Sequence, residues 1–299
     1  MTPQQKTAHL MPETERHAAS IKTTWISALV NTLLSIGQVI AGWLTGSFGL
    51  IADGIHTLSD LIADFVVLLA ASHSRKGADE DHHYGHARYE NAASLFLGVI
   101  LLCVAAFMVW SAVLKLHDWE NLPDVKIAAL WAAIVALICK ECLFRYMLSV
   151  AHRVGSSMLI ANAWHARSDA LSSLVVAIGI TGNLLGYPLL DPLAALLVGG
   201  MVGKMGWQFS VNAFHDLTDR ALPIEEMELI DKLLMATPGV VGIHDLRARK
   251  MGDLAIVDVH IDVDGQLTVQ TGHDIAVDAR RRVMECHRVQ NVMVHVDPV

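Results

Sequence analysis

Long runs of apolar residues dominate the first two thirds of the chain. Six runs approach the roughly 20 helical residues needed to cross about 30 Å of hydrocarbon. They occupy residues 24–46, 49–73, 91–114, 127–149, 157–185 and 189–212. The pattern therefore predicts a membrane α-helical bundle of six transmembrane helices.

The pattern changes after Asp219. Helical periodicity returns twice, and apolar and polar residues alternate as in strands three times. The predicted elements are a helix at 224–237, strands at 241–250 and 254–262, a helix at 270–286 and a strand at 289–296. The order α-β-β-α-β is typical of a small α+β domain with its helices on one face of a sheet. The predicted domains are an N-terminal tail (1–21), a transmembrane domain (22–215) and a soluble domain (216–299).

Charge refines this interpretation. Only 17% of residues are charged, against about 25% in soluble proteins, and the net charge of −8 argues against nucleic-acid binding. Lysine and arginine gather in the loops on one side of the predicted bundle, so both termini are expected in the cytoplasm. The first 21 residues lack the apolar core of a signal peptide. A bacterial inner membrane is the expected location.

Two of the predicted spans carry the same pattern of ionisable residues. His56 and Asp60 are four residues apart in the second span, as are His165 and Asp169 in the fifth. Each pair shares a helix face and lies near the middle of the membrane, where a charge costs about 2.5–3.5 kcal/mol. A divalent cation or a proton compensates that cost. Two imidazoles and two carboxylates suit tetrahedral Zn²⁺, and also accept Fe²⁺, Co²⁺ or Cd²⁺.

Other polar residues extend these pairs into two stripes. The stripes comprise Asp53, His56, Asp60 and Asp64 in the second span, and Asn162, His165, Asp169 and Ser172 or Ser173 in the fifth. We interpret them as the walls of a wet path, with Asp53 and Asn162 as accessory members. Alternatively, Asp53 and Asp64 only line a cavity or lie near the interface. Lys140 and Glu141 in the fourth span are expected to form a structural ion pair near the cytoplasmic end, with a proton relay as the alternative.

Three stretches resemble the cation diffusion facilitators, a family of dimeric metal–proton antiporters. They are the paired HxxxD motifs, the loop DEDHHYGHARYE and the run from LTDRALP to VHVDP. The resemblance covers nearly the whole chain after residue 20. It implies a homodimer with a ferredoxin-like, metallochaperone-like cytoplasmic domain. It also implies that the metal crosses the membrane bound to His56, Asp60, His165 and Asp169.

The resemblance implies further sites. A loop site would use Asp79, His82 and His86, although alone the motif reads as a solvated histidine-rich loop. A binuclear zinc site joining the protomers' soluble domains would use His244, His260, His273, His295 and Asp297. Without the resemblance these would be surface histidines. Arg88 and Asp219 match a charge pair that joins the membrane and cytoplasmic domains, where relatives more often have lysine in the first position.

These observations predict a divalent cation exporter, with Zn²⁺ leaving the cytoplasm in exchange for protons by alternating access. The C-terminal domain would act as a metal sensor. The alternatives are an Fe²⁺, Co²⁺ or Cd²⁺ exporter of the same mechanism, or a membrane metal sensor or scaffold that transports nothing. An intramembrane enzyme is disfavoured, because HExxH is absent and four protein ligands leave no open position on a tetrahedral ion.

Overall fold

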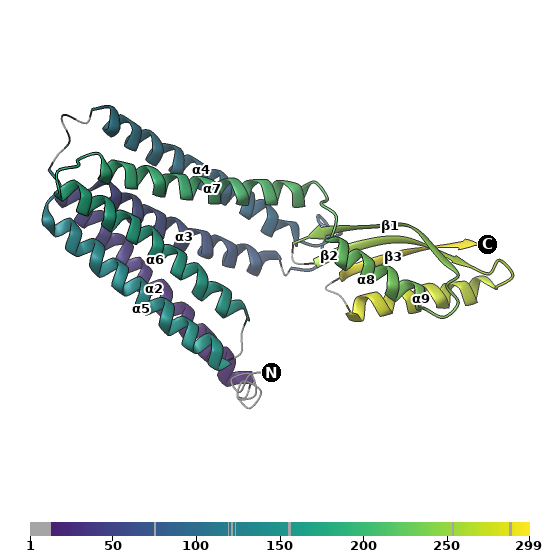
Figure 1. The fold of residues 1–299 in the computed structure, drawn as a ribbon. Helices are drawn as coiled ribbons and strands as arrows, with labels where there is room; N and C mark the ends of the chain where they lie inside the picture. The colour runs from purple at the N-terminus through teal and green to yellow at the C-terminus, as the bar shows by residue number, and fades with distance from the viewer. Residues whose placement is uncertain are drawn as a thin grey trace. The chain divides into compact units, whose positions relative to one another are not determined.

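The computed structural model describes residues 13–299, except 75, 119, 121, 123, 155–156, 253 and 287–288. Six long helices precede the C-terminal elements (Figure 1). They are α2 (Glu13–Thr45), α3 (Phe48–Ser74), α4 (Arg88–His117), α5 (Ile127–Val154), α6 (Ser157–Leu184) and α7 (Leu190–Leu217). All six predicted helices are present. Residues 1–12 of the predicted tail lie outside the described residues.

The first predicted span agrees with the candidate span Lys22–Thr45, and the helix that contains it is longer. Apolar residues start at about position 24, but α2 begins at Glu13. Hydropathy marks the part of a helix that suits hydrocarbon, whereas backbone hydrogen bonds continue through polar residues that favour helix. The helix therefore includes part of the segment predicted as a tail.

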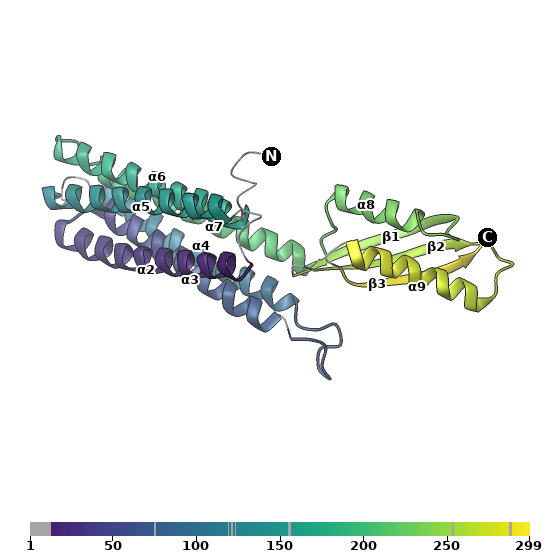
Figure 2. The ribbon, with the colours of Figure 1, turned by 90° about the horizontal axis from the view of Figure 1, so that it is seen from below.

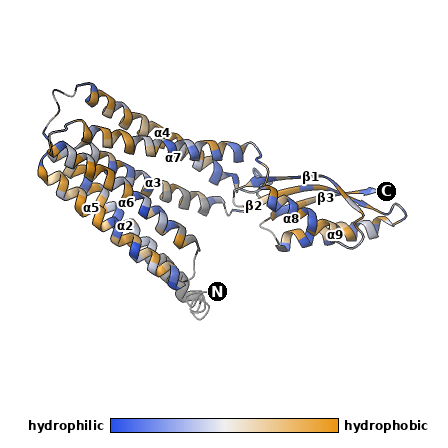
Figure 3. Ribbon diagram, in the orientation of Figure 1, coloured by the Kyte–Doolittle hydropathy of each residue, from blue (hydrophilic) through white to orange (hydrophobic). Residues whose placement is uncertain are grey.

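Several helices present apolar side chains outward. Among the described residues, α4 and the segments Lys22–Thr45 and Ile127–Arg153 are long and apolar enough to cross a membrane. Much of the ribbon of these helices has the orange of apolar residues in Figure 3. The side chain of Trp43, on α2, is 77% exposed. Such exposure would favour aggregation in water, so it identifies a surface that contacts lipid.

The chain forms two compact units, one comprising residues 1–65 and 99–207. In this unit α5 lies along α6, and α2 lies along α5 (Figures 1 and 2). Part of the core pairs large side chains with small ones. It consists of Leu143, Phe144 and Met147 on α5 with Ala163 and Ala166 on α6. Small residues let helices approach closely, which is how helices associate in lipid.

Asp191 joins the beginnings of α3 and α7. Its carboxylate, on α7, accepts hydrogen bonds from the Ser47 hydroxyl (2.6 Å) and from the backbone N–H groups of Phe48 (2.7 Å) and Gly49 (3.3 Å). The first N–H groups of a helix have no partner within the helix and favour a negative charge. A buried aspartate on one helix therefore caps another.

The second unit comprises residues 66–98 and 208–299 and includes the C-terminal elements. These are α8 (Ile224–Met235), β1 (Gly242–Met251), β2 (Leu254–Val263), α9 (Val269–Cys286) and β3 (Val289–Pro298). Each lies within a few residues of its predicted range. The sheet order is β1-β2-β3, with β1 antiparallel and β3 parallel to β2. Figures 1 and 2 show α8 and α9 on one face of the sheet, as predicted.

The alternation of residues along β2 determines the two faces of the sheet. Val257, Val259 and Ile261 are buried in a core shared with α8 and α9. His260 and Asp262 alternate with these valines and isoleucine and are only partly buried. Because successive side chains in a strand point to opposite faces, the helix-free face is the one that carries ionisable residues.

Gly42 on α2 offers a test of how closely the first two helices pack. A Cβ at Gly42 would lie 2.7 Å from Ile51 Cγ1 and 2.8 Å from the Ile51 backbone nitrogen, whereas a Cβ at Gly37 would meet nothing within 4 Å. We expect Gly42→Ala to destabilise the protein by about 1–3 kcal/mol through overpacking. Gly37→Ala, on the same helix, should be neutral or slightly stabilising. Thermal unfolding in detergent measures both, and equal effects would contradict the packing.

Candidate metal centre

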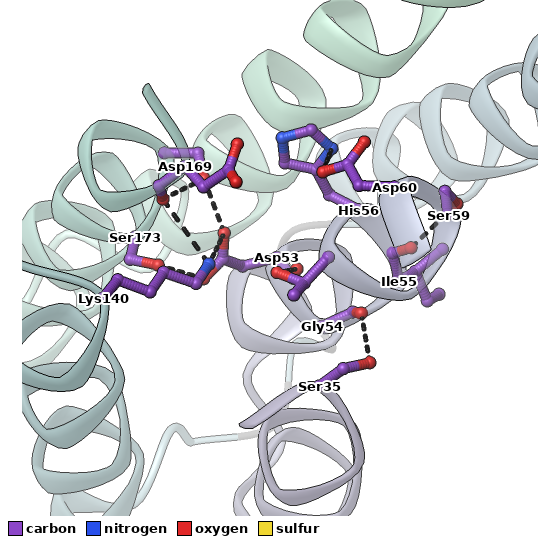
Figure 4. Close-up of polar contacts among 12 residues, drawn as sticks. Ser35, Asp53, Gly54, Ile55, His56, Ser59, Asp60, Lys140, Asp169 and Ser173 are labelled. Atoms are coloured by element: carbon purple, nitrogen blue, oxygen red, sulfur yellow. Dashed lines mark hydrogen bonds and ion pairs between the residues drawn. The ribbon is translucent and has the colours of Figure 1, made fainter. Parts of the chain in front are cut away.

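The second and fifth spans bring three predicted ligands together. His56 and Asp60 on α3 and Asp169 on α6 each offer one ligand atom, and these atoms all lie within 4.8 Å of one another. His56 and Asp169 are buried, with 5% and 7% of their surfaces exposed. Figure 4 shows the three side chains directed toward the same space. One imidazole and two carboxylates at this separation could hold a divalent cation.

The histidine of this group has a free coordinating atom. His56 Nδ1 lies 3.5 Å from Asp60 Oδ2. Among the described residues this buried nitrogen has no hydrogen-bond partner. A buried polar atom without a partner is rare and indicates a ligand, an ion or water. The donor set therefore fits a metal ion.

His165, the predicted fourth ligand, does not join the group. It is exposed on α6 and lies outside the three-residue cluster. It is nevertheless close enough to His56 to interact with it electrostatically. The structure thus places three of the four predicted ligands together and leaves the fourth nearby.

Asp53 has a different role from the one predicted. It is fully buried (0% exposed) and accepts hydrogen bonds from Gln38, Ser172 and Ser173. Its carboxylate also lies 3.2 Å from Lys140 Nζ. The prediction that Asp53 lines a wet path was therefore wrong, because its oxygens are occupied by protein donors.

The prediction of an ion pair between Lys140 and Glu141 was also wrong. Lys140 binds Asp53, whereas Glu141 accepts a hydrogen bond from Arg145 at 2.8 Å. Consecutive residues of a helix point in directions about 100° apart and do not face each other. A lysine within an apolar span needs an oppositely charged partner. The presence of Lys140 in such a span was therefore the sequence signal for a partner on another helix. Asn162 is partly buried, and the side chain of Asp64 lies outside the described residues.

The loop before α4 contains a second group. Asp79, His82 and His86 place ligand atoms within 4.8 Å of one another, as the resemblance predicted. His86 is buried, and its Nδ1 lies 3.2 Å from the Gly77 carbonyl, which leaves Nε2 facing Asp79 at 3.5 Å. A hydrogen bond to one ring nitrogen orients the other for a metal. A hydrogen bond from Lys76 holds the pKa of Asp79 well below its usual range, so the carboxylate is ionised.

The register of the C-terminal sheet builds a third group. His244, His260 and His295 are direct neighbours across β1, β2 and β3, with ring centroids 5.0 Å and 4.5 Å apart. They form a histidine ladder on the helix-free face. Asp297 accepts a hydrogen bond from His260 (2.8 Å) and lies 3.2 Å from His244 Nε2. These contacts, above all that with His260, lower the pKa of the Asp297 carboxyl.

Only part of the predicted C-terminal ligand set gathers in one chain. His244, His260 and Asp297 place ligand atoms within 4.8 Å of one another, and His295 Nε2 lies 3.4 Å from Asp297. His273, on α9, lies instead in a cavity of about 380 Å³ with Val296 and Pro298. A strand bulge follows His244, with Asp245 at a φ of 51°. Bulges of this kind redirect side chains next to sites.

The predicted charge pair is present and has a third member. Arg88, the first residue of α4, donates a hydrogen bond to Asp219. Arg249 on β1 donates to the other carboxylate oxygen at 3.4 Å. Asp219 itself adopts a φ of 61°, an uncommon conformation for a residue with a side chain. One carboxylate therefore connects the start of α4 to the sheet.

Comparisons with known proteins give matches along most of the chain. A family model described as "Cation efflux transmembrane domain" matches residues 24–218, and "Cation efflux protein, cytoplasmic domain" matches residues 222–299. An uncharacterized transporter of Methanocaldococcus jannaschii is 34% identical over 92% of this chain and 96% of its own. The manganese efflux system protein MneP of Bacillus subtilis is 30% identical over 95% and 98%.

Among solved structures, a nickel form of the MamM C-terminal domain is 26% identical. The match covers 26% of this chain and 99% of that one, with a TM-score of 0.25. The two family models together span almost all of the described helices and strands. The chain belongs to the cation efflux family, the cation diffusion facilitators, and is an integral membrane protein that exports divalent metal cations and not an enzyme.

Proposed function

We propose that the protein exports Zn²⁺ from the cytoplasm in exchange for protons, by alternating access. The observation that carries this proposal is the convergence of His56, Asp60 and Asp169 on one buried point between two helices. Both helices belong to the matched transmembrane domain. A site with ligands from two helices can open to either side when those helices move.

His165 completes the ligand set in this proposal. It lies four residues before Asp169 on α6, so one small rotation of this helix brings both side chains toward α3. His56 is already within electrostatic reach. The ion would then have two imidazoles and two carboxylates, the tetrahedral set that suits zinc.

Manganese is the second candidate metal. The relative MneP is named for manganese efflux, and carboxylates suit Mn²⁺. The imidazoles favour zinc, because manganese prefers oxygen ligands. Fe²⁺, Co²⁺ and Cd²⁺ are compatible with the same mechanism and belong in the same test.

Proton exchange follows from the chemistry of the ligands. Metal binding needs neutral imidazoles and ionised carboxylates, so protons and metal compete for the same atoms. Histidine has an ordinary pKa of about 6.5, which allows this competition near neutral pH. Protons from the outer side release the metal, and the protonated site returns to face the cytoplasm.

We further propose that the protein is a homodimer whose cytoplasmic sites sense the metal. The matched C-terminal family domain and the histidine ladder support this role. Because His273 lies away from the ladder in its own chain, it would enter a shared binuclear site from the second copy. Asp79, His82 and His86 would form a loop site on the same side of the membrane. Both termini would lie in the cytoplasm, and the membrane would be a bacterial inner membrane.

The transport site is tested in proteoliposomes that contain the full-length protein. We expect wild type to take up Zn²⁺, and uptake to accelerate when the compartment opposite the metal is acidified. Asp169→Asn should lower uptake by more than about 100-fold, because it removes a ligand and a charge. Ser168→Ala is the matched control, since this exposed neighbour lies on the same helix. It should transport like wild type.

Three results would count against the proposal. Transport by Asp169→Asn at the wild-type rate would exclude the site. If wild type and the variants bind Zn²⁺ but none of them takes it up, the scaffold interpretation is favoured. If Mn²⁺ moves and Zn²⁺ does not, the site stands and manganese replaces zinc as the cargo.

Acid should empty the C-terminal site through its histidines rather than through Asp297. The lowered pKa of Asp297 keeps this carboxylate ionised until the pH falls below its ordinary value of about 3.9. We therefore expect zinc binding by the cytoplasmic site to be lost at a pH above this value, because the imidazole ligands must be neutral to bind the ion.

Titration calorimetry of the Asp169→Asn protein, in which the transport site is disabled, measures this binding. His260→Asn should abolish the C-terminal component. Asp258→Asn, an exposed carboxylate on the same strand, should leave the component intact. A binding midpoint below about pH 4 would show that Asp297 and not histidine controls release.

A further inference from the structure

A buried ion pair adjoins the ligand group and takes no part in the proposed coordination. Asp53 lies three residues before His56 on α3, and Lys140 reaches it from α5. Lys140 Nζ is 3.3 Å from Oδ1 and 3.2 Å from Oδ2 of Asp53, and the two residues are 1% and 0% exposed. Buried charges are tolerated only when they are paired and hydrogen-bonded. This pair meets both requirements.

The hydrogen bonds around Asp53 come from three helices. Gln38 Nε2 on α2 donates at 2.5 Å. On α6, the hydroxyl of Ser172 donates at 2.7 Å and that of Ser173 at 2.5 Å. Together with Lys140 on α5 these groups occupy both carboxylate oxygens. Asp53 is therefore held as a structural anion and is not offered to a metal.

The same groups contact a proposed ligand residue. The backbone carbonyl oxygen of Asp169 lies 3.4 Å from Lys140 Nζ and 2.8 Å from Ser172 Oγ, the hydroxyl that also contacts Asp53. On α3, residues 53, 56 and 60 follow helical spacing along one face. Figure 4 shows Asp53 and Lys140 beside Asp169, with His56 and Asp60 adjacent. The Asp53–Lys140 pair is thus next to the proposed ligands of both helices: Asp53 shares α3 with His56, and Lys140 contacts Asp169 on α6.

The charges of this neighbourhood add up simply. Asp60 and Asp169 contribute two negative charges to the ligand group, and Asp53 contributes a third within the same low-dielectric interior. The ammonium of Lys140 cancels the third. A divalent cation therefore meets a net charge of about −2, and charges a few ångströms away act strongly where water is excluded.

We propose that the Asp53–Lys140 pair sets the metal affinity of the transport site by fixing the net charge around it, without ligating the metal. This inference rests on the transport function proposed above. Lys140 and Asp53 are positioning residues in this scheme. They tune how firmly the ligands hold the ion and how readily they release it.

In this scheme, removing the charge of Lys140 and removing that of Asp53 change the affinity for Zn²⁺ in opposite directions. Lys140→Gln leaves Asp53 uncompensated, while Gln38, Ser172 and Ser173 still stabilise its carboxylate. Zn²⁺ should then bind about tenfold more tightly, with a lower KM and a lower turnover because release is slower. Asp53→Asn leaves the lysine uncompensated. Zn²⁺ should then bind about tenfold more weakly, with a raised KM.

Two further variants separate charge from structure. The double variant Asp53→Asn/Lys140→Gln restores neutrality, so its affinity for Zn²⁺ should lie within about threefold of wild type. Ser173→Ala removes one hydrogen bond to Asp53 and no charge, and its affinity should also stay within about threefold.

The experiment uses full-length protein in lipid nanodiscs for binding and in proteoliposomes for uptake. Zn²⁺ affinity is measured at pH 7 by competition with a fluorescent chelator, in a His82→Asn/His260→Asn background that disables the loop site and the histidine ladder. Only protein that elutes as a monodisperse species is used. If a single variant does not fold, the double variant and the remaining single variant still decide the matter.

The expected result is that Lys140→Gln binds Zn²⁺ more tightly than wild type and Asp53→Asn binds it more weakly. The double variant should have an affinity near that of wild type. If both single variants weaken binding alike, or if the double variant differs from wild type by more than about tenfold, the pair is only structural and the inference is overturned. Failure of the proposed function looks different. In that case wild type would move no metal, although the affinities could still be compared.

Discussion

The cost of placing charge where water is scarce controls the membrane part of this protein. Five of its described ionisable residues are buried among apolar helices: Asp53, His56, Lys140, Asp169 and Asp191. A charge there has to be matched by an opposite charge, by hydrogen bonds or by a bound ion. Asp53 and Lys140 satisfy each other. His56, Asp60 and Asp169 form a group that a divalent cation can satisfy. The contacts of Asp53 connect α2, α3, α5 and α6 in addition to their apolar packing.

In the C-terminal domain, histidine and aspartate side chains are brought together in a different way. At its surface, water solvates charged groups at little cost in free energy, so burial does not require them to pair. The geometry of the sheet has to bring the candidate ligands together. The sheet does so through register, since His244, His260 and His295 are direct neighbours on three strands. A shift of one residue would move a histidine to the face covered by α8 and α9. The apolar core of Val257, Val259 and Ile261 therefore also holds the ladder in place.

Much of this architecture could be predicted from the sequence. Apolar length identified the long helices, and alternation identified the strands with their faces, because these patterns depend on local periodicity. The i,i+4 spacing placed His56 beside Asp60. Contacts between distant segments were harder. Lys140 was assigned to its neighbour Glu141, because only the packing of four helices reveals Asp53 as its partner. The exposure of His165 likewise depends on the rotation of α6, which spacing does not specify.

The cap that Asp191 provides has a mechanical consequence. It fixes the first turn of α3 to α7 through three hydrogen bonds. His56 lies about 12 Å along the helix from that point, and Ser74 lies about 39 Å from it, at about 1.5 Å per residue. If α3 tilts about this fixed end, Ser74 is displaced about three times as far as His56.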